Sequence, residues 1–181
     1  VASSFMAPTA RAALTDLGIR VETIGIASSI ADSKAQIADL AELASAPAKG
    51  ATLIETIDKA VSNARPSDDV KVPTVLWQPA GIVAGDNALV SELMRVAGFA
   101  SHSAAIGLEQ ADYLSLEHML SEPPQMLLLA GREPGQRHPA LQQMAQRGDL
   151  AIASFDPSHL YCGGPTIIRA LDRLSGIRDT V

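Results

Sequence analysis

The chain has 181 residues, of which 47% are hydrophobic and 19% charged. This composition supports a packed core and excludes a disordered chain, and the length fits one large domain or two small ones. The formal net charge is −6, and no basic stripe or basic aromatic-rich run occurs, so nucleic acid is not an expected partner. No apolar run approaches the roughly 20 residues that span a bilayer, and a single cysteine excludes an internal disulfide.

The first 28 residues read as a fragment of an α/β unit. Val1 to Ser4 has the pattern of a strand that enters a loop, and residues 8–17 form a short predicted helix closed by Gly18. Residues 19–26 alternate as in a strand. The chain begins with neither methionine nor the basic segment of a signal peptide, so we expect it to start inside a longer gene product.

Two helices are expected next. Ser29, with Asp32 three residues on, has the pattern of a helix start, and apolar residues continue at helical spacing to about residue 45. A proline interrupts this pattern, and a second helix is predicted over 48–63. Residues 65–71 are polar and contain a proline, which favours a linker.

A new alternation of strands and helices follows the linker. Buried-type strands are expected at 73–77, 125–129 and 150–154. Helices are expected at 86–97, with Asp86 as the cap, from Ser115, at 139–147 and from Pro165. Residues 100–113 are expected to be mostly loop.

This alternation implies parallel pairing and right-handed crossovers, so the predicted fold class is α/β. We expect a Rossmann-like C-terminal lobe over 72–181, in which helices flank a parallel sheet. A helical connector over 29–71 precedes it, and residues 1–28 are the remnant of a second α/β lobe.

Leu160-Tyr-Cys-Gly-Gly-Pro165 is a candidate ligand loop. Its glycines permit a sharp turn, and Pro165 suits the first turn of the helix that follows. Loops at the carboxyl ends of parallel strands are where open α/β sheets bind ligands. An ordinary glycine-containing connection is the alternative.

Four stretches carry a family resemblance. They are Trp77 to Gly85 with a following helix that closes on Ala97-Gly-Phe99, then Tyr113 to Leu120, Arg137 to Leu141, and Tyr161 to Pro165. In this order and spacing they resemble the periplasmic substrate-binding proteins that serve ABC importers of cobalamin, ferric siderophores and haem. The helical pair is similar to the long helix that joins the two lobes in that family. The chain departs from the family by Pro124-Gln125 in place of Pro-Asp, and by the expected lack of most of the N-terminal lobe.

The resemblance implies a ligand held between two lobes. On this side the expected ligand contacts are Trp77, Gln78, Ile82, Tyr113 and Tyr161. Trp77 ends a buried strand and fits the core equally well, whereas Tyr113 follows a loop and is expected to face the ligand. Tyr161 lines the same cleft or makes a local hydrogen bond.

Glu117 matches the family's glutamate that docks on arginines of the inner-membrane permease. Its local alternative is a carboxylate that stabilises the N-terminus of its own helix.

No catalytic motif occurs, and the four histidines show no metal-ligand spacing, so neither an enzyme, a cofactor nor a metal site is expected. The resemblance therefore predicts the periplasmic solute-binding component of an importer for an iron chelate or corrinoid. One alternative is a Rossmann-like enzyme that binds a nucleotide or phosphorylated molecule at Gly163-Gly164-Pro165. Another is a stand-alone half-protein whose exposed lobe face forms a homodimer.

Overall fold

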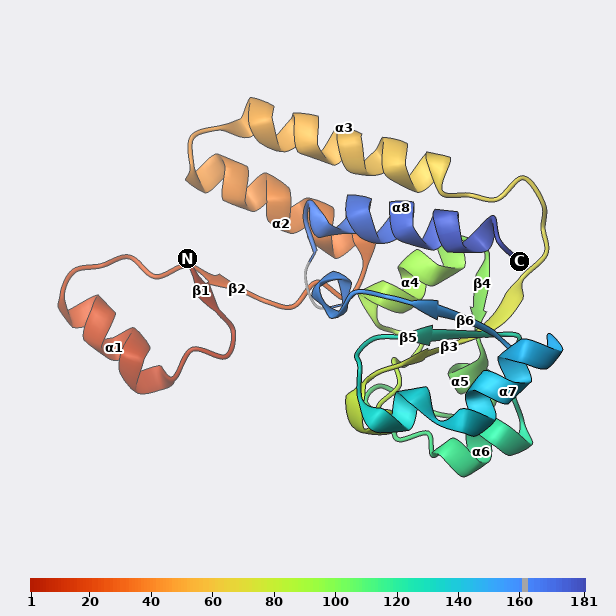
Figure 1. The fold of residues 1–181 in the computed structure, drawn as a ribbon. Helices are drawn as coiled ribbons and strands as arrows, with labels where there is room; N and C mark the ends of the chain where they lie inside the picture. The colour runs from red at the N-terminus through yellow and green to blue at the C-terminus, as the bar shows by residue number, and fades with distance from the viewer. Residues whose placement is uncertain (161–162) are drawn as a thin grey trace.

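The computed structural model describes residues 1–160 and 163–181. Within them the C-terminal lobe contains a four-stranded sheet (Figure 1). Its strands are β3 (Val72–Trp77), β4 (Phe99–Ser101), β5 (Met126–Leu129) and β6 (Ala151–Ser154). They lie in the order β4-β3-β5-β6, and all neighbours pair in parallel. The predicted α/β class with a parallel sheet is confirmed.

Helices cover both faces of this sheet (Figure 1). On one face lie α4 (Leu89–Val96) and α8 (Thr166–Arg178), and on the other α5 (His102–Ala105), α6 (Leu116–Ser121) and α7 (Pro139–Arg147). Short 3-10 turns follow three of the strands: η1 (Pro79–Gly81), η2 (Pro134–Arg137) and η3 (Pro157–His159).

The two covered faces explain why the strands read as continuous apolar runs. In β5, Met126 and Leu128 pack into the core on the α4–α8 side, while Leu127 packs into the core on the α6–α7 side. All three side chains are buried, as strands of parallel sheets usually are.

The connector consists of α2 (Ile30–Leu43) and α3 (Pro47–Asn63), which pack against each other. Gly50 allows the close approach, since a Cβ at this position would overlap the Ala41 side chain. The start of α2 is fixed to the C-terminal lobe by two hydrogen bonds. The Ile30 amide donates to Glu92 Oε2 at 2.7 Å, and the Gly164 amide donates to Ser33 Oγ at 2.7 Å.

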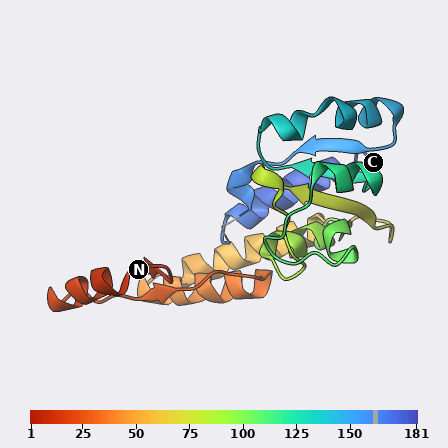
Figure 2. The same ribbon diagram turned by 90° about the horizontal axis from the view of Figure 1, so that it is seen from below.

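The N-terminal segment, residues 1–28, is built differently. Strands β1 (Ala2–Ser3) and β2 (Thr23–Ile24) form a two-stranded parallel sheet, and α1 (Pro8–Asp16) has no buried residue. Large apolar side chains here are exposed: Val1, Phe5, Leu17, Ile19 and Ile26. Figure 2 shows the segment extending away from the rest of the molecule.

The structure corrects three details of the sequence analysis. Residues 99–101 form the edge strand β4, which overlaps the start of the stretch 100–113 that was predicted to be mostly loop. Asp86 is not the cap of α4, which begins at Leu89 after Ala88; the Asp86 carboxylate instead pairs with Arg95 at 3.1 Å. The strand predicted over 19–26 is reduced to two residues, because its pairing with β1 extends no further.

The boundaries placed at residues 28 and 71 stay predictions. None of the helices in the described residues has the length and apolar character that crossing a membrane requires.

Candidate functional site

The candidate site lies at the carboxyl edge of the four-stranded sheet. From β3 the chain runs outward to β4 on one side, and then returns to β5 and β6 on the other. The loops after β3 and β5 therefore diverge at a topological switch point, which is where open α/β sheets bind ligands.

The loop after β3 is anchored by Trp77. This side chain is 4% exposed, lies in the core on the α6–α7 side, and donates from Nε1 to the Leu114 carbonyl at 3.1 Å. Its burial favours the core interpretation, and its indole ties the β3 loop to the segment before α6. Gln78 beside it is also buried.

Ile82 and Tyr113 form an exposed apolar surface, which we call the platform. They face each other in an antiparallel bridge, supported by the hydrogen bond from the Leu114 amide to the Gly81 carbonyl at 2.8 Å. A Cβ at Gly81, where φ is +80°, would overlap the Tyr113 ring, so glycine lets the ring lie against the backbone. Ile82 is 38% exposed and Tyr113 is 65% exposed, which leaves both available to a ligand.

Two side chains join the loop after β3 to the loop after β5. Glu133 accepts from the Ala80 amide at 2.8 Å, and Gln136 donates to the Trp77 carbonyl at 3.0 Å. Gln136 also accepts from the Glu133 amide at 3.1 Å, which completes a capping box. Because Gln136 is almost fully buried, these bonds hold the two loops in a fixed relation.

A cleft of about 530 Å³ lies at the ends of β5 and β6. Its lining includes apolar residues, Leu129 and Phe155, and a set of charged or titratable side chains that sequence reasoning did not single out for this site: Arg132, Arg137, Asp156, His159 and Arg173. We call this cleft the arginine pocket.

Of the three arginines, Arg173 is fixed by its neighbours. It donates to the Ser154 carbonyl from Nε at 3.2 Å and from Nη2 at 2.8 Å. The guanidinium groups of Arg132 and Arg137 have no hydrogen-bond or ion-pair partner among the described residues.

The remaining polar groups of the pocket are Asp156 and His159. The Ser158 amide donates to Asp156 at 2.8 Å and lowers the pKa of that carboxyl below its ordinary value, and the nearby His159 and Arg132 charges act in the same direction. The His159 ring meets Phe155 edge-on at 5.6 Å, and its buried Nδ1 has no partner within the described part of the chain.

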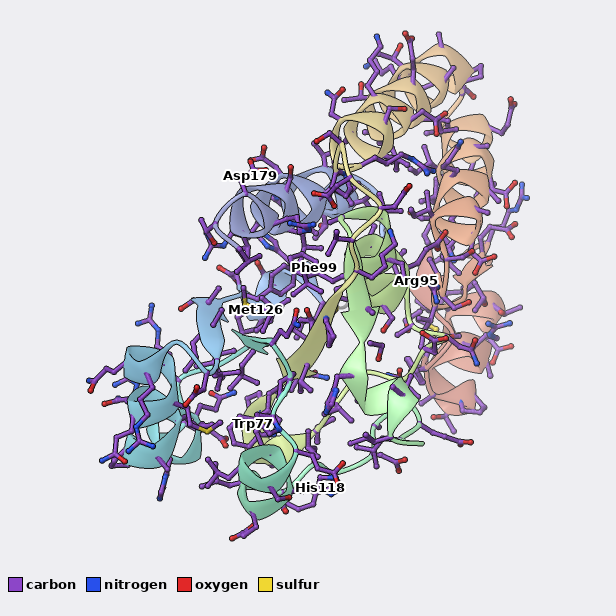
Figure 3. The ribbon with its side chains drawn as sticks, turned by 90° about the vertical axis from the view of Figure 1, so that its right-hand side faces the viewer. Trp77, Arg95, Phe99, His118, Met126 and Asp179 are labelled. Atoms are coloured by element: carbon purple, nitrogen blue, oxygen red, sulfur yellow. The ribbon has the colours of Figure 1, made fainter. Side chains whose placement is uncertain are left out.

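Glu117 lies away from the pocket, in the first turn of α6. Ser115 caps this helix by accepting from the His118 amide at 3.2 Å. Figure 3 shows the adjacent His118 at one end of the lobe and Asp179 at the other. The Glu117 side chain is exposed and makes no hydrogen bond or ion pair to the residues that the structure describes.

Tyr161 lies outside the described residues, as does Cys162. The Ser33 side chain packs against the glycine turn beside them. The Gly164 amide donates to the Ser33 hydroxyl, and a Cβ at Gly163 would overlap the same hydroxyl. The phosphate site that the enzyme alternative places at this turn therefore lacks one of its amide donors. Among the described residues, no group of three or more metal-ligating side chains comes together.

The sequence held one signal for the arginine pocket. Arg132 and Arg137 lie in a loop that contains two glycines and a proline and directly follows a buried strand, at the sheet edge where ligands bind. The contributions of Arg173 and His159 had no such signal, because they come from segments further along the chain.

Comparison with known proteins supports the architecture. A family model described as periplasmic binding protein matches residues 1–151. The haem-binding protein HutB of Vibrio cholerae superposes with a TM-score of 0.77 at 22% identity, over 97% of this chain and 74% of that one.

Two further solved structures are similar. The haem-binding protein RhuT of Roseiflexus gives a TM-score of 0.76 at 20% identity, over 97% of this chain and 73% of its own. The vitamin B12-binding protein BtuF of Vibrio cholerae gives 0.70 at 13%, over 96% and 70%. At these identities the likeness concerns the fold. No curated protein matches the sequence significantly.

Proposed function

Because the chain belongs to the periplasmic binding protein family, we propose that it is the solute-binding component of an ABC importer. It captures an iron chelate or cobalamin-like ligand and delivers it to an inner-membrane permease. The three solved structures described above are those of periplasmic proteins that bind haem or vitamin B12. A periplasmic location for this chain is part of the proposal.

The observation that carries the proposal is the platform beside the arginine pocket at the switch point of the sheet. Ile82 and Tyr113 offer exposed apolar surface, while Trp77 and Gln78 are buried and support the loop that carries Ile82. In Figure 1 the carboxyl ends of β5 and β6 point toward the side on which β1 and β2 lie. A ligand on this edge would be enclosed between the two α/β regions, with Tyr161 as a further proposed contact.

Binding of chelates is the first test. The protein is titrated with haem, cyanocobalamin and a ferric hydroxamate, with fluorescence quenching as the readout. We expect saturable one-to-one binding of one of them. Thermal stabilisation by ATP or phosphate, with no binding of any chelate, would contradict the proposal and favour the enzyme alternative.

Glu117 is the proposed docking residue for the permease. Its exposed carboxylate has no partner in the described residues, and an arginine of the permease would bind it in a bidentate, orienting contact. This contact lies at α6, outside the arginine pocket, so docking and ligand binding involve different side chains.

Charge reversal separates docking from binding. In Glu117→Arg we expect loss of ligand uptake by cells that carry the importer, with unchanged affinity of the purified protein for its chelate. Glu122→Arg is the matched control, because it makes the same charge change on an exposed residue at the other end of α6. Loss of ligand affinity in Glu117→Arg, or equal loss of uptake in both variants, would refute the docking role.

A further inference from the structure

We propose that the free edge of β2 is a docking site for an extended basic segment of another polypeptide. The site is a groove of about 630 Å³ between β2 and α2, which lie beside each other (Figure 1). We call it the acidic groove, and its lining residues are Arg20, Glu22, Thr23, Ile24 and Gly25 on the strand side and Gln36, Asp39, Glu42 and Leu43 on α2. This role goes beyond the proposed function, because the groove shares no residue with the platform or the arginine pocket.

The first observation is that one edge of β2 is unused. The Glu22 carbonyl accepts from the Ala2 amide at 2.8 Å. The Ile24 carbonyl accepts from the Ser4 amide at 3.0 Å, so both carbonyls face β1. Backbone groups alternate along a strand, and the amide and carbonyl of Thr23 therefore point to the opposite edge, where they have no hydrogen-bond partner among the described residues. Adding a strand to such an edge is a common way of binding an extended peptide.

The same edge lacks the usual protection against strand addition. Proteins commonly protect a free edge with proline, lysine or a bulge. Residues 21–25, Val-Glu-Thr-Ile-Gly, contain neither proline nor lysine, and Ala2 and Ser3 of β1 pair in regular register with Thr23 and Ile24. The edge is therefore open to a further strand.

Helix α2 forms the second wall of the groove and is tied to the end of the strand. Gln36 donates from Nε2 to the Gly25 carbonyl at 3.1 Å. Asp39 and Glu42 line the groove one helical turn apart. Both side chains are exposed, and neither carboxylate makes a hydrogen bond or an ion pair to the residues that the structure describes.

The charge of the groove selects a basic partner. Its single cation, Arg20, is already paired with Glu22 at 2.6 Å, which leaves the negative charges of Asp39 and Glu42 uncompensated. The described residues contain no group of three or more metal-ligating side chains, so a metal ion is not the expected occupant. A second copy of the chain carries a formal net charge of −6 and would be repelled.

An extended segment satisfies both the edge and the charge. Alternate side chains of a strand lie on the same face, so basic residues at alternate positions can face α2 while the backbone pairs with Thr23. Leu43, which is 45% exposed, offers apolar surface to the methylene stem of a lysine or arginine.

The test uses the full chain and a blocked seven-residue peptide that alternates lysine and valine, with calorimetry as the readout. We expect one-to-one binding that weakens as salt is added. The same peptide with glutamate in place of lysine should bind at least about tenfold more weakly.

Methylation of the peptide backbone tests the pairing separately from the charge. One version carries N-methyl groups on all its valines and another on all its lysines. Because only one edge of an added strand faces β2, we expect one version to lose about tenfold in affinity and the other to keep it. Attraction by charge alone predicts equal affinities.

Variants of the chain test the two walls. Thr23→Pro removes the free amide of the edge while the β1 pairing, which does not use this amide, remains, so peptide binding should be lost. In Asp39→Asn with Glu42→Gln we expect the affinity to fall about fivefold or more. Asp149→Asn with Asp172→Asn is the matched control, because it makes the same change in net charge at exposed residues outside the groove. Circular dichroism verifies that each variant is folded.

Several results would overturn the proposal. They include no binding of the lysine peptide, equal binding of the glutamate peptide, equal effects of the two methylated versions, and equal affinities of the two double variants. A dimer of the chain that Thr23→Pro abolishes would identify a second copy as the occupant instead. None of these results bears on the chelate titration, so the proposed function is tested independently.

Discussion

The C-terminal lobe and the N-terminal segment contain the same kinds of element but differ in what those elements bury. In the lobe, β5 is enclosed between two helical layers, and Leu127 and Leu128 are fully buried. In the segment, α1 buries no residue and the sheet has two strands of two residues each. Local sequence pattern thus specifies the elements in both regions, whereas tertiary burial stabilises only one of them.

The largest expected effect compares one leucine from each region. Leu128→Ala leaves a cavity in a fully buried strand and should lower the free energy of unfolding by about 3 kcal/mol. Leu17→Ala removes a side chain that is 75% exposed and should change it by less than about 0.5 kcal/mol. Urea denaturation of both variants measures the difference. Equal losses would mean that the segment's apolar residues are buried in solution.

A smaller loss of stability is expected at Gln136, which joins the loops after β3 and β5. Gln136→Ala leaves the buried Trp77 carbonyl without its side-chain donor and the Glu133 amide without its acceptor. The expected cost is about 2 kcal/mol of stability, together with weaker ligand binding because the β3 and β5 loops lose their tie. Gln143→Ala, on the exposed side of α7, is the control. A Gln136→Ala protein with unchanged stability and affinity would show that the tie does not position the loops.

The smallest effect lies where the segment joins the connector. Hydrogen bonds from the side chains of Ser28 and Ser29 and from the Ser28 amide lower the pKa of Asp32 below its ordinary value of 3.8. A depressed pKa means that this contribution to stability is present at neutral pH and is lost as pH falls through the folded-state pKa, below 3.8. In Asp32→Asn the free energy of unfolding should therefore decrease less as the pH is lowered than it does in the unmodified protein. Denaturation from about pH 6 to about pH 3 measures it, and identical profiles would contradict the prediction.

Much of the fold was predictable because burial on both faces of a parallel sheet leaves a plain apolar signal, as at Leu127 and Leu128. The edge strand β4 was not, since three residues after Gly98 are too few for a periodicity and acquire their identity by pairing with Val72. Asp86 was wrongly predicted as the cap, because α4 begins three residues later and the Asp86 carboxylate pairs with Arg95 in the last turn of that helix.

The candidate site was predictable only where chain order and spatial order coincide. The loop after β3 was identified, and it carries Ile82. The arginine pocket gathers side chains from the β5 loop, η3 and α8, and no spacing in the sequence relates Arg132 to Arg173. The sequence also left open whether Trp77 lies in the core or faces the ligand. In the structure it is buried, and its indole donates to the Leu114 carbonyl.

The two hydrogen bonds that fix the start of α2, from Ile30 to Glu92 and from Gly164 to Ser33, determine where the molecule can bend. They tie the start of α2 to the C-terminal lobe. Gln36 of α2 also holds the Gly25 carbonyl and Asp32 holds Ser28, which leaves Ile26 and Ala27 as the joint to β2. A ligand enclosed on the carboxyl edge therefore need not deform the core. Its affinity depends instead on the freedom that the segment gives up at this joint, so a stiffer joint, for example one with proline in place of Ala27, becomes a route to tighter capture.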